Sequence, residues 1–417
     1  MKKIIVLAST FPLSNSDPTP SFVMDQIVEL KKKYNDIEFT VLAPSYQNKK
    51  YSENLYFNEY RFRYFFSRFE KLAGEGILPV LRKNFLYTLV IPFFLISQLL
   101  ATLKLINKLK PDLIYAHWVM PQALIALICF KLTGVPFVFT SHAHDAEILT
   151  KLPIIGKLLL NTIVKNAKSF TFDSKHTEYK LKRNIKKKNW NQDKSKIIPM
   201  GVNSNKFESI ESTEIIEISK YYNKFKIVYA GRFAKKKGVE SLINSLKEIP
   251  EILDEIVLII CGSGALVNEY FRLIDKHGLT ENVKIIKFFN DTPKLKYIYE
   301  IADLIVVPSI VTKGGDVEGL PVVLMESMYF GNATLSSFQS NAGEIINDGK
   351  NGFLFDSDKN FELSQKIKYI FKRKDSLMNI KIEAEKESKK YLLESVNSQF
   401  YIHLFNNIKI RNNFSPG

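Results

Sequence analysis

The chain has 417 residues, 46% of them hydrophobic, which is too long for one ordinary core and predicts two domains of about 200 residues each. Its two cysteines, Cys129 and Cys261, lie in separate apolar runs, which excludes a four-cysteine metal site and a disulfide framework and favours a reducing compartment. The net charge of +16 is concentrated in residues 1–205, with 30 Lys and Arg against 15 Asp and Glu, an excess typical of proteins that bind nucleic acid or an anionic membrane.

Short apolar segments alternate with helical patterns along the whole chain, which predicts parallel sheets covered by helices on both faces. The first segment resembles the start of a signal peptide, but its apolar run is only five residues long, so we expect a buried first strand. The strands predicted in the first half are 3–8, 38–43, 113–116, 137–140, 169–171 and 196–198.

Two aromatic or apolar segments of the first half are flanked by basic residues. Residues 57–69 interleave Phe and Tyr with Arg, and residues 85–103 are strongly apolar with Lys or Arg on both sides. This combination is typical of a helix that lies at a lipid interface. Residues 85–103 are also near the length that spans a bilayer, although they include Pro92, Ser97 and Gln98. A helix packed wholly inside the first domain is the third interpretation.

Two histidines follow the predicted strand 137–140, where His142, His144 and Asp145 lie. Histidines two residues apart can ligate a metal, but no third ligand with suitable spacing is evident, so we expect no metal site. Either histidine can equally be an ordinary loop residue.

The domain boundary is predicted near residue 205, because residues 180–196 are polar and Lys-rich and the residues after them have turn chemistry. We interpret the Lys cluster as a solvated helix end. The predicted parts are a basic N-terminal domain at 1–205, a C-terminal domain at 206–395, and a helix and tail at 396–417 that return toward the first domain. The strands predicted in the second half are 226–230, 256–261, 283–286, 304–307, 333–336 and 352–355.

Two carboxylates, Glu318 and Glu326, flank a stretch that includes Gly319 and Pro321. Pro is favoured at the first helical position and Gly just past the last, so a short helix is expected from Pro321 to Gly331. Glu318 then lies in the loop before the helix and Glu326 inside it, and the break between them lets both approach one ligand. The free N–H groups of the helix start add an anion site at the same place.

A second anion site is predicted at residues 229–239, between a buried strand and a helix. Arg232 and Lys237 would converge on a phosphate there, with Gly231 and Gly238 permitting tight turns. The string is not a Walker loop and is weak evidence alone. Open α/β sheets nevertheless bind ligands beyond the carboxyl ends of their strands, where Arg232, residues 262–264 and Glu318 are all expected.

With these residues placed, the chain resembles the family 4 glycosyltransferases. The resemblance rests on the Glu-x7-Glu motif of Glu318 and Glu326, with Ala302-Asp303 and Val307-Pro308-Ser309 before it, 198–203 with Phe207 at the linker, and 112–118 in the first domain. The Gly-Gly-Asp-Val-Glu-Gly-Leu-Pro form is similar to enzymes of bacterial exopolysaccharide, capsule and O-antigen synthesis, such as those for colanic acid. The family implies a GT-B fold, with two Rossmann-like doubly wound parallel-sheet domains facing each other across a cleft, and transfer with retention of configuration.

The resemblance also implies roles for single residues. Glu318 would bind donor-sugar hydroxyls beside the reacting carbon, Glu326 the ribose of the nucleotide, and Arg232 and Lys237 the diphosphate, while His142 would face the donor sugar. Family members attack from the front face with the departing phosphate as base, so Glu318 is assigned to orientation and charge stabilisation. The residues implied as catalytic are Glu318, His142, Arg232 and Lys237; as donor-binding, Arg232, Lys237, Gly262, Gly264, Glu318, Gly319, Leu320 and Glu326; and as acceptor-side, Thr10, Phe11, His117, Trp118 and His144.

The implied donor is a UDP- or GDP-linked sugar, without a metal or other cofactor. The implied acceptor is a lipid-linked oligosaccharide at the inner face of the cytoplasmic membrane, where the basic aromatic domain would meet anionic lipid; no nucleic acid is expected. Three departures from the family pattern concern Ala143 after the histidine, residues 340–344 in place of Gly-Gly-x-x-Glu, and a loop after the first strand without glycines. A nucleotide-sugar epimerase or phosphorylase on the same fold, and a basic nucleic-acid-binding protein, are the alternative functions.

Overall fold

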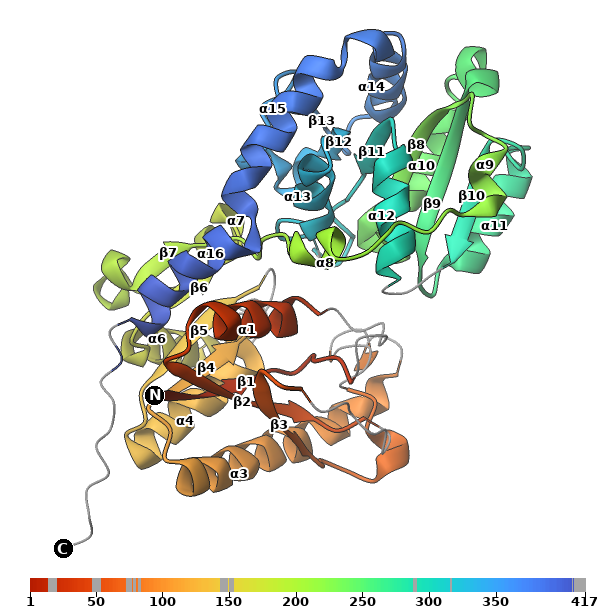
Figure 1. The fold of residues 1–417 in the computed structure, drawn as a ribbon. Coiled ribbons are helices and arrows are strands. Elements are labelled where there is room, and N and C mark those ends of the chain that lie inside the picture. The colour runs from red at the N-terminus through yellow and green to blue at the C-terminus, as the bar shows by residue number, and fades with distance from the viewer. Residues whose placement is uncertain are drawn as a thin grey trace, which may run out of the picture. The chain divides into compact units, whose positions relative to one another are not determined.

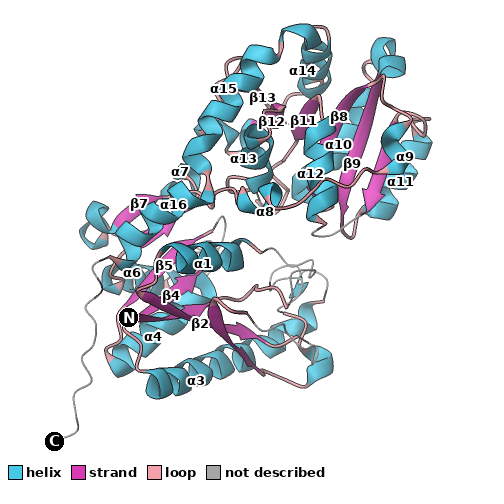
Figure 2. Ribbon diagram, in the orientation of Figure 1, coloured by secondary structure: helices cyan, strands magenta, loops and turns pink. Residues whose placement is uncertain are grey.

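The computed structural model describes residues 1–13, 21–46, 54–72, 77, 80–81, 84–142, 149, 154–287, 291–315, 317–406 and 408. The chain divides into two compact units: unit 1 comprises Met1–Pro199 and the chain from Val396 onward, and unit 2 comprises Met200–Ser395. Each unit contains one parallel sheet covered by helices on both faces (Figure 1, Figure 2), so the predicted α/β fold class is confirmed.

The sheet of unit 1 has seven parallel strands in the order β3-β2-β1-β4-β5-β6-β7. All residues of β4 and β5 are buried, because parallel strands covered by helices have no solvent face. The six predicted strands are all present, whereas β3 was not predicted. The strands are β1 (Lys2–Leu7), β2 (Ile37–Pro44), β3 (Phe57–Phe62), β4 (Leu113–His117), β5 (Phe137–Ser141), β6 (Phe170–Phe172) and β7 (Ser195–Ile197).

The helices of unit 1 form a layer on each face of this sheet. α1 lies on one face and α3 and α4 lie on the other (Figure 1), with α4 packed against both α3 and α6. The chain re-enters unit 1 within α16, and Phe405 beyond it packs edge-on against Phe39 and Tyr115. The helices are α1 (Phe22–Lys33), α3 (Ile91–Leu109), α4 (Leu124–Thr133), α6 (Ile155–Asn166), α7 (Lys175–Lys182) and α16 (Leu393–Phe400).

The sheet of unit 2 has six parallel strands in the order β10-β9-β8-β11-β12-β13, and all six were predicted. The first six residues of β9 are buried, and they pack between two hydrophobic clusters, one on each face of the sheet. The strands are β8 (Phe225–Arg232), β9 (Ile256–Ser263), β10 (Val283–Lys287), β11 (Leu304–Val307), β12 (Ala333–Ser337) and β13 (Phe353–Phe355).

The helices of unit 2 divide between these clusters. α10, α11 and α14 contribute to one cluster, and α8, α9, α12, α13 and α15 contribute to the other. The helices are α8 (Asn205–Glu208), α9 (Ile216–Ser219), α10 (Val239–Leu246), α11 (Val267–Lys276), α12 (Thr292–Ile301), α13 (Val322–Tyr329), α14 (Glu362–Phe371) and α15 (Met378–Ser388).

The same aspartate device anchors the two sheets. Asp112 Oδ2 accepts a hydrogen bond from the backbone N–H of Lys3 at 2.8 Å, and Asp303 Oδ2 accepts one from Lys226 at the same distance. Asp112 immediately precedes β4, and Asp303 immediately precedes β11. Each hydrogen bond therefore ties that strand to the neighbouring first strand of its unit, β1 or β8. These two motif residues therefore lie at the amino ends of the strands, away from the edge where ligands bind in such sheets.

Two expectations are corrected by the fold. Residues Phe57–Phe62, expected in a lipid-interface helix, form the edge strand β3 instead. The apolar helix α3 is not packed wholly inside unit 1, because Phe93, Ile96 and Leu100 are more than half exposed.

Candidate functional site

The loop after β8 carries the basic side chains of the predicted anion site. It passes so close to β11 that a Cβ on Gly238, which has φ +68°, would lie 1.8 Å from the carbonyl oxygen of Pro308. The backbone N–H of Ile310 also donates to the carbonyl of Lys236 at 2.9 Å. Glycine at 238 thus lets this loop rest on the segment after β11, which leads to Glu318.

Glu318 is held by two lysines of that loop. Lys237 Nζ lies 3.0 Å from Glu318 Oε2, and Lys236 Nζ lies 3.2 Å from Glu318 Oε1. Burial of the Glu318 carboxyl favours its neutral form, but the charges and hydrogen bonds of Lys237 and Lys236 outweigh burial and lower its pKa to about 2. Glu318 is therefore a partly buried carboxylate, with its side chain 11% exposed, that stays ionised at neutral pH.

Lys236 and Lys237 pair with this carboxylate, and the charge of Arg232 acts on Lys237. Burial lowers the pKa of Lys237, and the charges of Lys236 and Arg232 act in the same direction against the attraction of Glu318. Arg232, at the end of β8, is exposed and makes no ion pair with any carboxylate among the described residues. With all three cations protonated, the group carries two positive charges more than it needs to neutralise Glu318, which suits an anion with about two negative charges.

Asn341 fixes the backbone next to Glu318. The backbone of Asn341 has φ +59°, a left-handed conformation that asparagine tolerates. The side-chain Nδ2 of Asn341 donates to the carbonyl oxygens of Glu318 at 2.8 Å and Gly319 at 3.3 Å. Residues 340–344, which depart from the family pattern, therefore hold the motif loop through a side chain.

Glu326 is placed by an aromatic stack. It lies on α13, and its Oε2 accepts a hydrogen bond from the buried hydroxyl of Tyr299 on α12 at 2.7 Å. The ring of Tyr299 stacks on Phe330 with centroids 5.0 Å apart, and Phe207 of the linker packs edge-on against both rings. The aromatic cluster therefore sets the position of the hydroxyl that meets the carboxylate.

The predicted glycines bring β8 and β9 together at their carboxyl ends. A Cβ on Gly262, at φ +137°, would lie 1.9 Å from the carbonyl of Gly231, and one on Gly264 would lie 2.5 Å from that of Phe233. Leu320 differs from the other predicted donor residues, because its side chain is 8% exposed and packs in a hydrophobic cluster.

In unit 1, His142 and His117 form a stacked pair at the ends of β5 and β4. Their rings lie 5.5 Å apart at an angle of 10°, and His117 Nδ1 lies 3.2 Å from His142 Nε2. Burial lowers the pKa of His142 to about 3, so this imidazole is neutral at pH 7. Trp118 and Phe22 flank His142, with centroid distances of 5.2 Å each.

The remaining acceptor-side residues follow β1. Phe11 is 3% exposed, and its ring packs edge-on against Phe57. Arg61 of β3 donates to the carbonyl oxygens of Phe11 and Pro12, so it ties this loop to the sheet edge. Thr10 is half-buried beside them, and His144 lies outside the described residues.

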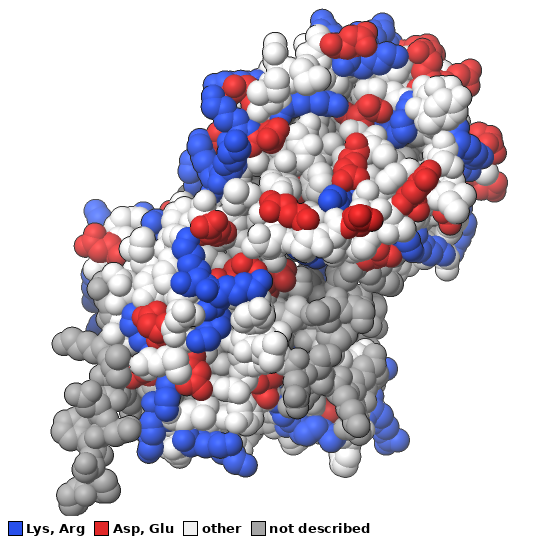
Figure 3. Space-filling model, in the orientation of Figure 1, with Lys and Arg blue, Asp and Glu red and all other residues white. Residues whose placement is uncertain are grey.

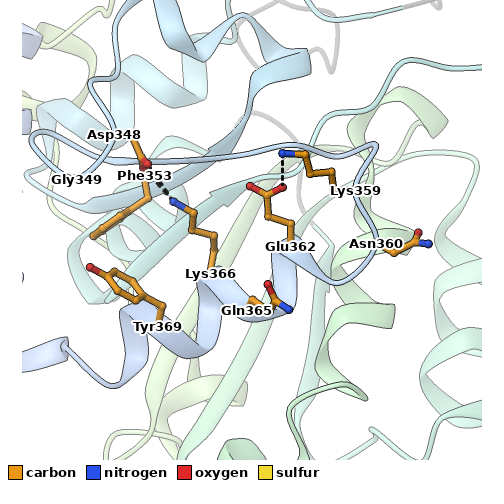
Figure 4. Close-up of a pocket in the computed structure, with 9 residues that line it drawn as sticks. All are labelled: Asp348, Gly349, Phe353, Lys359, Asn360, Glu362, Gln365, Lys366 and Tyr369. Carbon is orange, nitrogen blue, oxygen red and sulfur yellow. Dashed lines mark hydrogen bonds and ion pairs between the residues drawn. The ribbon is translucent and has the colours of Figure 1, made fainter.

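A surface pocket of about 460 Å³ on β13 and α14 contains none of the predicted site residues. Figure 4 shows Lys366 pointing at Asp348 and Lys359 at Glu362, with nitrogen–oxygen distances of 3.0 and 3.7 Å. Since its charged side chains pair with one another, we do not regard this pocket as the candidate site. It is lined by Asp348, Gly349, Phe353, Lys359, Asn360, Glu362, Gln365, Lys366 and Tyr369.

Two doubly wound parallel sheets, each with polar side chains at the carboxyl ends of its strands, define a protein of the GT-B class. Anabaena HepE, solved in complex with UDP, shares this fold with a TM-score of 0.68 over 96% of this chain and 99% of its own, at 18% identity. An uncharacterized glycosyltransferase of Methanocaldococcus jannaschii is 24% identical over 371 residues, which are 88% of this chain and 90% of that protein.

Separate parts of the sequence match two protein family models and a shorter stretch of a further protein. Residues 22–206 match Glycosyltransferase Family 4, and residues 211–387 match Glycosyl transferases group 1. WcaL of Escherichia coli K12, named for colanic acid biosynthesis, is 28% identical over 141 residues, or 34% of each chain. The first half of the chain therefore matches one glycosyltransferase family model and the second half matches another.

Proposed function

We propose that the chain transfers a sugar, with retention of configuration, from a nucleoside diphosphate sugar to a saccharide acceptor. The observation that carries this proposal is the charged group of Arg232, Lys236 and Lys237 with ionised Glu318. In this group both lysines pair with the carboxylate and the charge of Arg232 acts on Lys237. The group's excess of two positive charges matches the roughly two negative charges of a sugar-linked diphosphate, and the adjacent carboxylate offers acceptor oxygens to sugar hydroxyls.

The proposed roles follow from the charge that develops in the reaction. The bond between the anomeric carbon and the phosphate oxygen breaks, so positive charge grows on the sugar and negative charge on the diphosphate. Arg232 and Lys237 stabilise the diphosphate, and Glu318 binds the sugar hydroxyls and the growing positive charge. The acceptor hydroxyl attacks from the same face and gives its proton to the departing phosphate, which gives retention without a covalent intermediate.

Glu326 and His142 complete the proposed donor contacts. Glu326 accepts hydrogen bonds from the ribose hydroxyls, which its position on α13, about one turn past the first helical residue Val322, supports. His142 is neutral and hydrogen-bonds the donor sugar rather than acting as a cation. For the base we propose UDP over GDP, because HepE of the same fold was solved with both UDP and UDP-glucose.

For the acceptor we propose a lipid-linked oligosaccharide of cell-surface polysaccharide synthesis, used at the inner face of the cytoplasmic membrane. The similarity to WcaL supports the pathway class. The charge of residues 1–205, 30 Lys and Arg against 15 Asp and Glu, supports an anionic lipid surface as the place of reaction.

A donor panel tests the reaction. Purified protein is incubated with UDP-, GDP-, ADP- and dTDP-sugars, and thermal stabilisation and slow nucleotide release are measured in buffer with and without EDTA. We expect one UDP-sugar to raise the melting temperature and to be hydrolysed equally with EDTA.

Three results would contradict the proposal. An absence of stabilisation and release with every donor would argue against a nucleotide-sugar site. Interconversion of the donor sugar without an acceptor would identify an epimerase, and a requirement for inorganic phosphate would identify a phosphorylase.

Tyr299→Phe is expected to weaken UDP binding about 10-fold, because a hydrogen bond to a charged group contributes roughly 1.5–3 kcal/mol. The variant keeps the ring that stacks on Phe330 and removes only the hydroxyl that donates to Glu326. Titration calorimetry with UDP measures the change, with the exposed Tyr222→Phe as the matched control. An unchanged dissociation constant in Tyr299→Phe would argue against Glu326 as the ribose ligand.

A further inference from the structure

Three helices of unit 1 form a surface without acidic side chains. α3, α4 and α6 lie side by side in the order α3, α4, α6, and none of the 43 Asp and Glu residues of the chain lies in them. In Figure 3 the visible face of unit 2 mixes acidic and basic side chains, whereas the lower margin, where α3 runs in Figure 1, is mainly basic and uncharged. The lysines of this three-helix face are Lys104, Lys108, Lys131, Lys157 and Lys165.

The outer side of the face is apolar as well as basic. Along α3 and the turn before it, exposed side chains recur every three or four residues, which places them on one stripe. The stripe consists of Leu89, Phe93, Ile96, Leu100, Lys104 and Lys108, and its four apolar members are 51% to 71% exposed. Such a contiguous patch of exposed apolar side chains indicates a site of contact with another protein or with a membrane.

α6 repeats the pattern of α3. Ile154, Ile155 and Leu158 are 65% to 83% exposed at its beginning, and Lys165 lies in its last turn. Leu132 of α4 adds a further exposed apolar side chain. The apolar part of the face therefore extends over more than one helix.

The apolar ends lie at the edge of the sheet that carries the acceptor-side residues. α3, α4 and α6 each connect parallel strands, so each runs from the carboxyl edge of the sheet back to its amino edge. The exposed apolar residues of α3 lie in its first half and those of α6 in its first turn, where Lys157 also lies. Lys104, Lys108 and Lys165 lie toward the other ends of these helices, and Leu132 lies in the last turn of α4. His142 and Trp118 are at the same carboxyl edge as the apolar ends.

We propose that unit 1 binds an anionic lipid surface through this three-helix face, with the apolar ends of α3 and α6 entering the headgroup layer and the lysines contacting lipid phosphates. Lysines without acidic neighbours on the same helices complement a negative surface, and exposed apolar side chains enter lipid. Of the exposed apolar side chains named on these three helices, only Phe93 is aromatic, whereas single-stranded nucleic acid is bound by several aromatic rings on which successive bases stack. A second copy of the chain is a poor partner for this face, because pairing two such faces would bring the lysines of one copy close to the lysines of the other.

The same helices indicate contact rather than a membrane crossing. Phe85–Leu109 is long and apolar enough to span a bilayer by length and composition. However, Phe94, Leu105 and Ile106 on the inner side of α3 belong to the core of unit 1. Only the outer side is available to lipid. The surface deepens the proposed function, because it would bring a lipid-linked acceptor to the edge that holds His142.

Sedimentation of the full chain with vesicles tests the surface. We expect binding to phosphatidylcholine vesicles that contain phosphatidylglycerol, and at least 10-fold weaker binding to phosphatidylcholine alone. Phe93→Ser/Ile96→Ser/Leu158→Ser and Lys104→Glu/Lys157→Glu should each lower binding to the anionic vesicles at least 10-fold. The control Ile216→Ser/Tyr222→Ser/Ile382→Ser changes three equally exposed apolar residues of unit 2 and should bind as the wild type does.

Two readouts separate this inference from the proposed reaction. Donor hydrolysis without lipid should be the same in the wild type and all three variants, so lost lipid binding with intact hydrolysis supports the surface. Wild-type lipid binding by the two unit 1 variants, or no binding of the wild type to either vesicle, would overturn it. A dimer in light scattering that Phe93→Ser/Ile96→Ser/Leu158→Ser abolishes, without lipid binding, would overturn it in favour of self-association.

Discussion

Replacing Glu318 with alanine is expected to lower the turnover number about 100-fold or more, the loss typical when a preorganised electrostatic contact to the reacting centre is removed. Glu318 is the carboxylate on which Lys236 and Lys237 converge, at 3.2 and 3.0 Å. Its removal takes away both the proposed sugar ligand and the anion that balances two partly buried lysines. Initial-rate kinetics on the donor found in the panel measure the loss, and Glu217→Ala, an exposed glutamate of the same unit, is the control.

Glu318→Gln separates charge from shape in the same experiment. The amide keeps the volume but not the charge, so we expect a turnover loss close to that of Glu318→Ala and a lower free energy of unfolding at pH 7. Turnover near the wild-type value in either variant would remove Glu318 from the proposed mechanism.

Acid titration checks the environment of Glu318 independently of catalysis. The pKa of Glu318 is lowered to about 2 from a usual value of 4.5, so its contribution to stability is complete above pH 4.5 and is lost as the pH falls toward 2. The difference in free energy of unfolding between wild type and Glu318→Gln should therefore be constant above pH 4.5 and shrink below it. Urea denaturation at a series of pH values measures this difference, and a difference that does not depend on pH would contradict the ion pairs.

The pattern of the sequence was sufficient to predict the strands that are buried on both faces. β9 begins with six apolar residues in a row, and only a strand covered by helices on both sides places all of them in a core. β3 was missed because Asn58, Glu59 and Arg61 interrupt its apolar residues. Glu59 and Arg61 form an ion pair with each other, and both are 7% exposed, so the pairing that makes burial possible is not visible in the sequence.

The candidate site residues were identified from their positions directly after predicted strands and from the short helix predicted between Pro321 and Gly331. Such local rules identify Arg232, Lys237 and Glu318 as candidates, but they do not show which side chains meet. Lys236 was missed although it neighbours Lys237, because its contact with Glu318 joins two loops far apart in sequence. Asn341 and Tyr299 were missed for the same reason: each reaches the motif only through the folded sheet and its helices.

Replacing Arg232 with alanine is likewise expected to lower the turnover number about 100-fold or more, but without a change in stability. Arg232 is exposed, makes no ion pair with a carboxylate among the described residues, and uses its backbone carbonyl to accept the hydroxyl hydrogen of Tyr229 at 2.8 Å. Alanine keeps that carbonyl, so the free energy of unfolding should change by less than about 0.5 kcal/mol, as for other surface substitutions. The exposed Arg272→Ala on α11 is the matched control for turnover and stability.

Arg232→Lys distinguishes a planar contact to the diphosphate from a general positive potential. Lysine keeps the charge but loses the forked donors of arginine, so we expect a turnover between those of Arg232→Ala and the wild type. Equal turnover in Arg232→Lys and the wild type would indicate that only charge matters at this position. Equal turnover in Arg232→Ala and the wild type would leave Lys236 and Lys237 as the cations that meet the leaving group, and these two lysines are also the ones that Glu318 already holds.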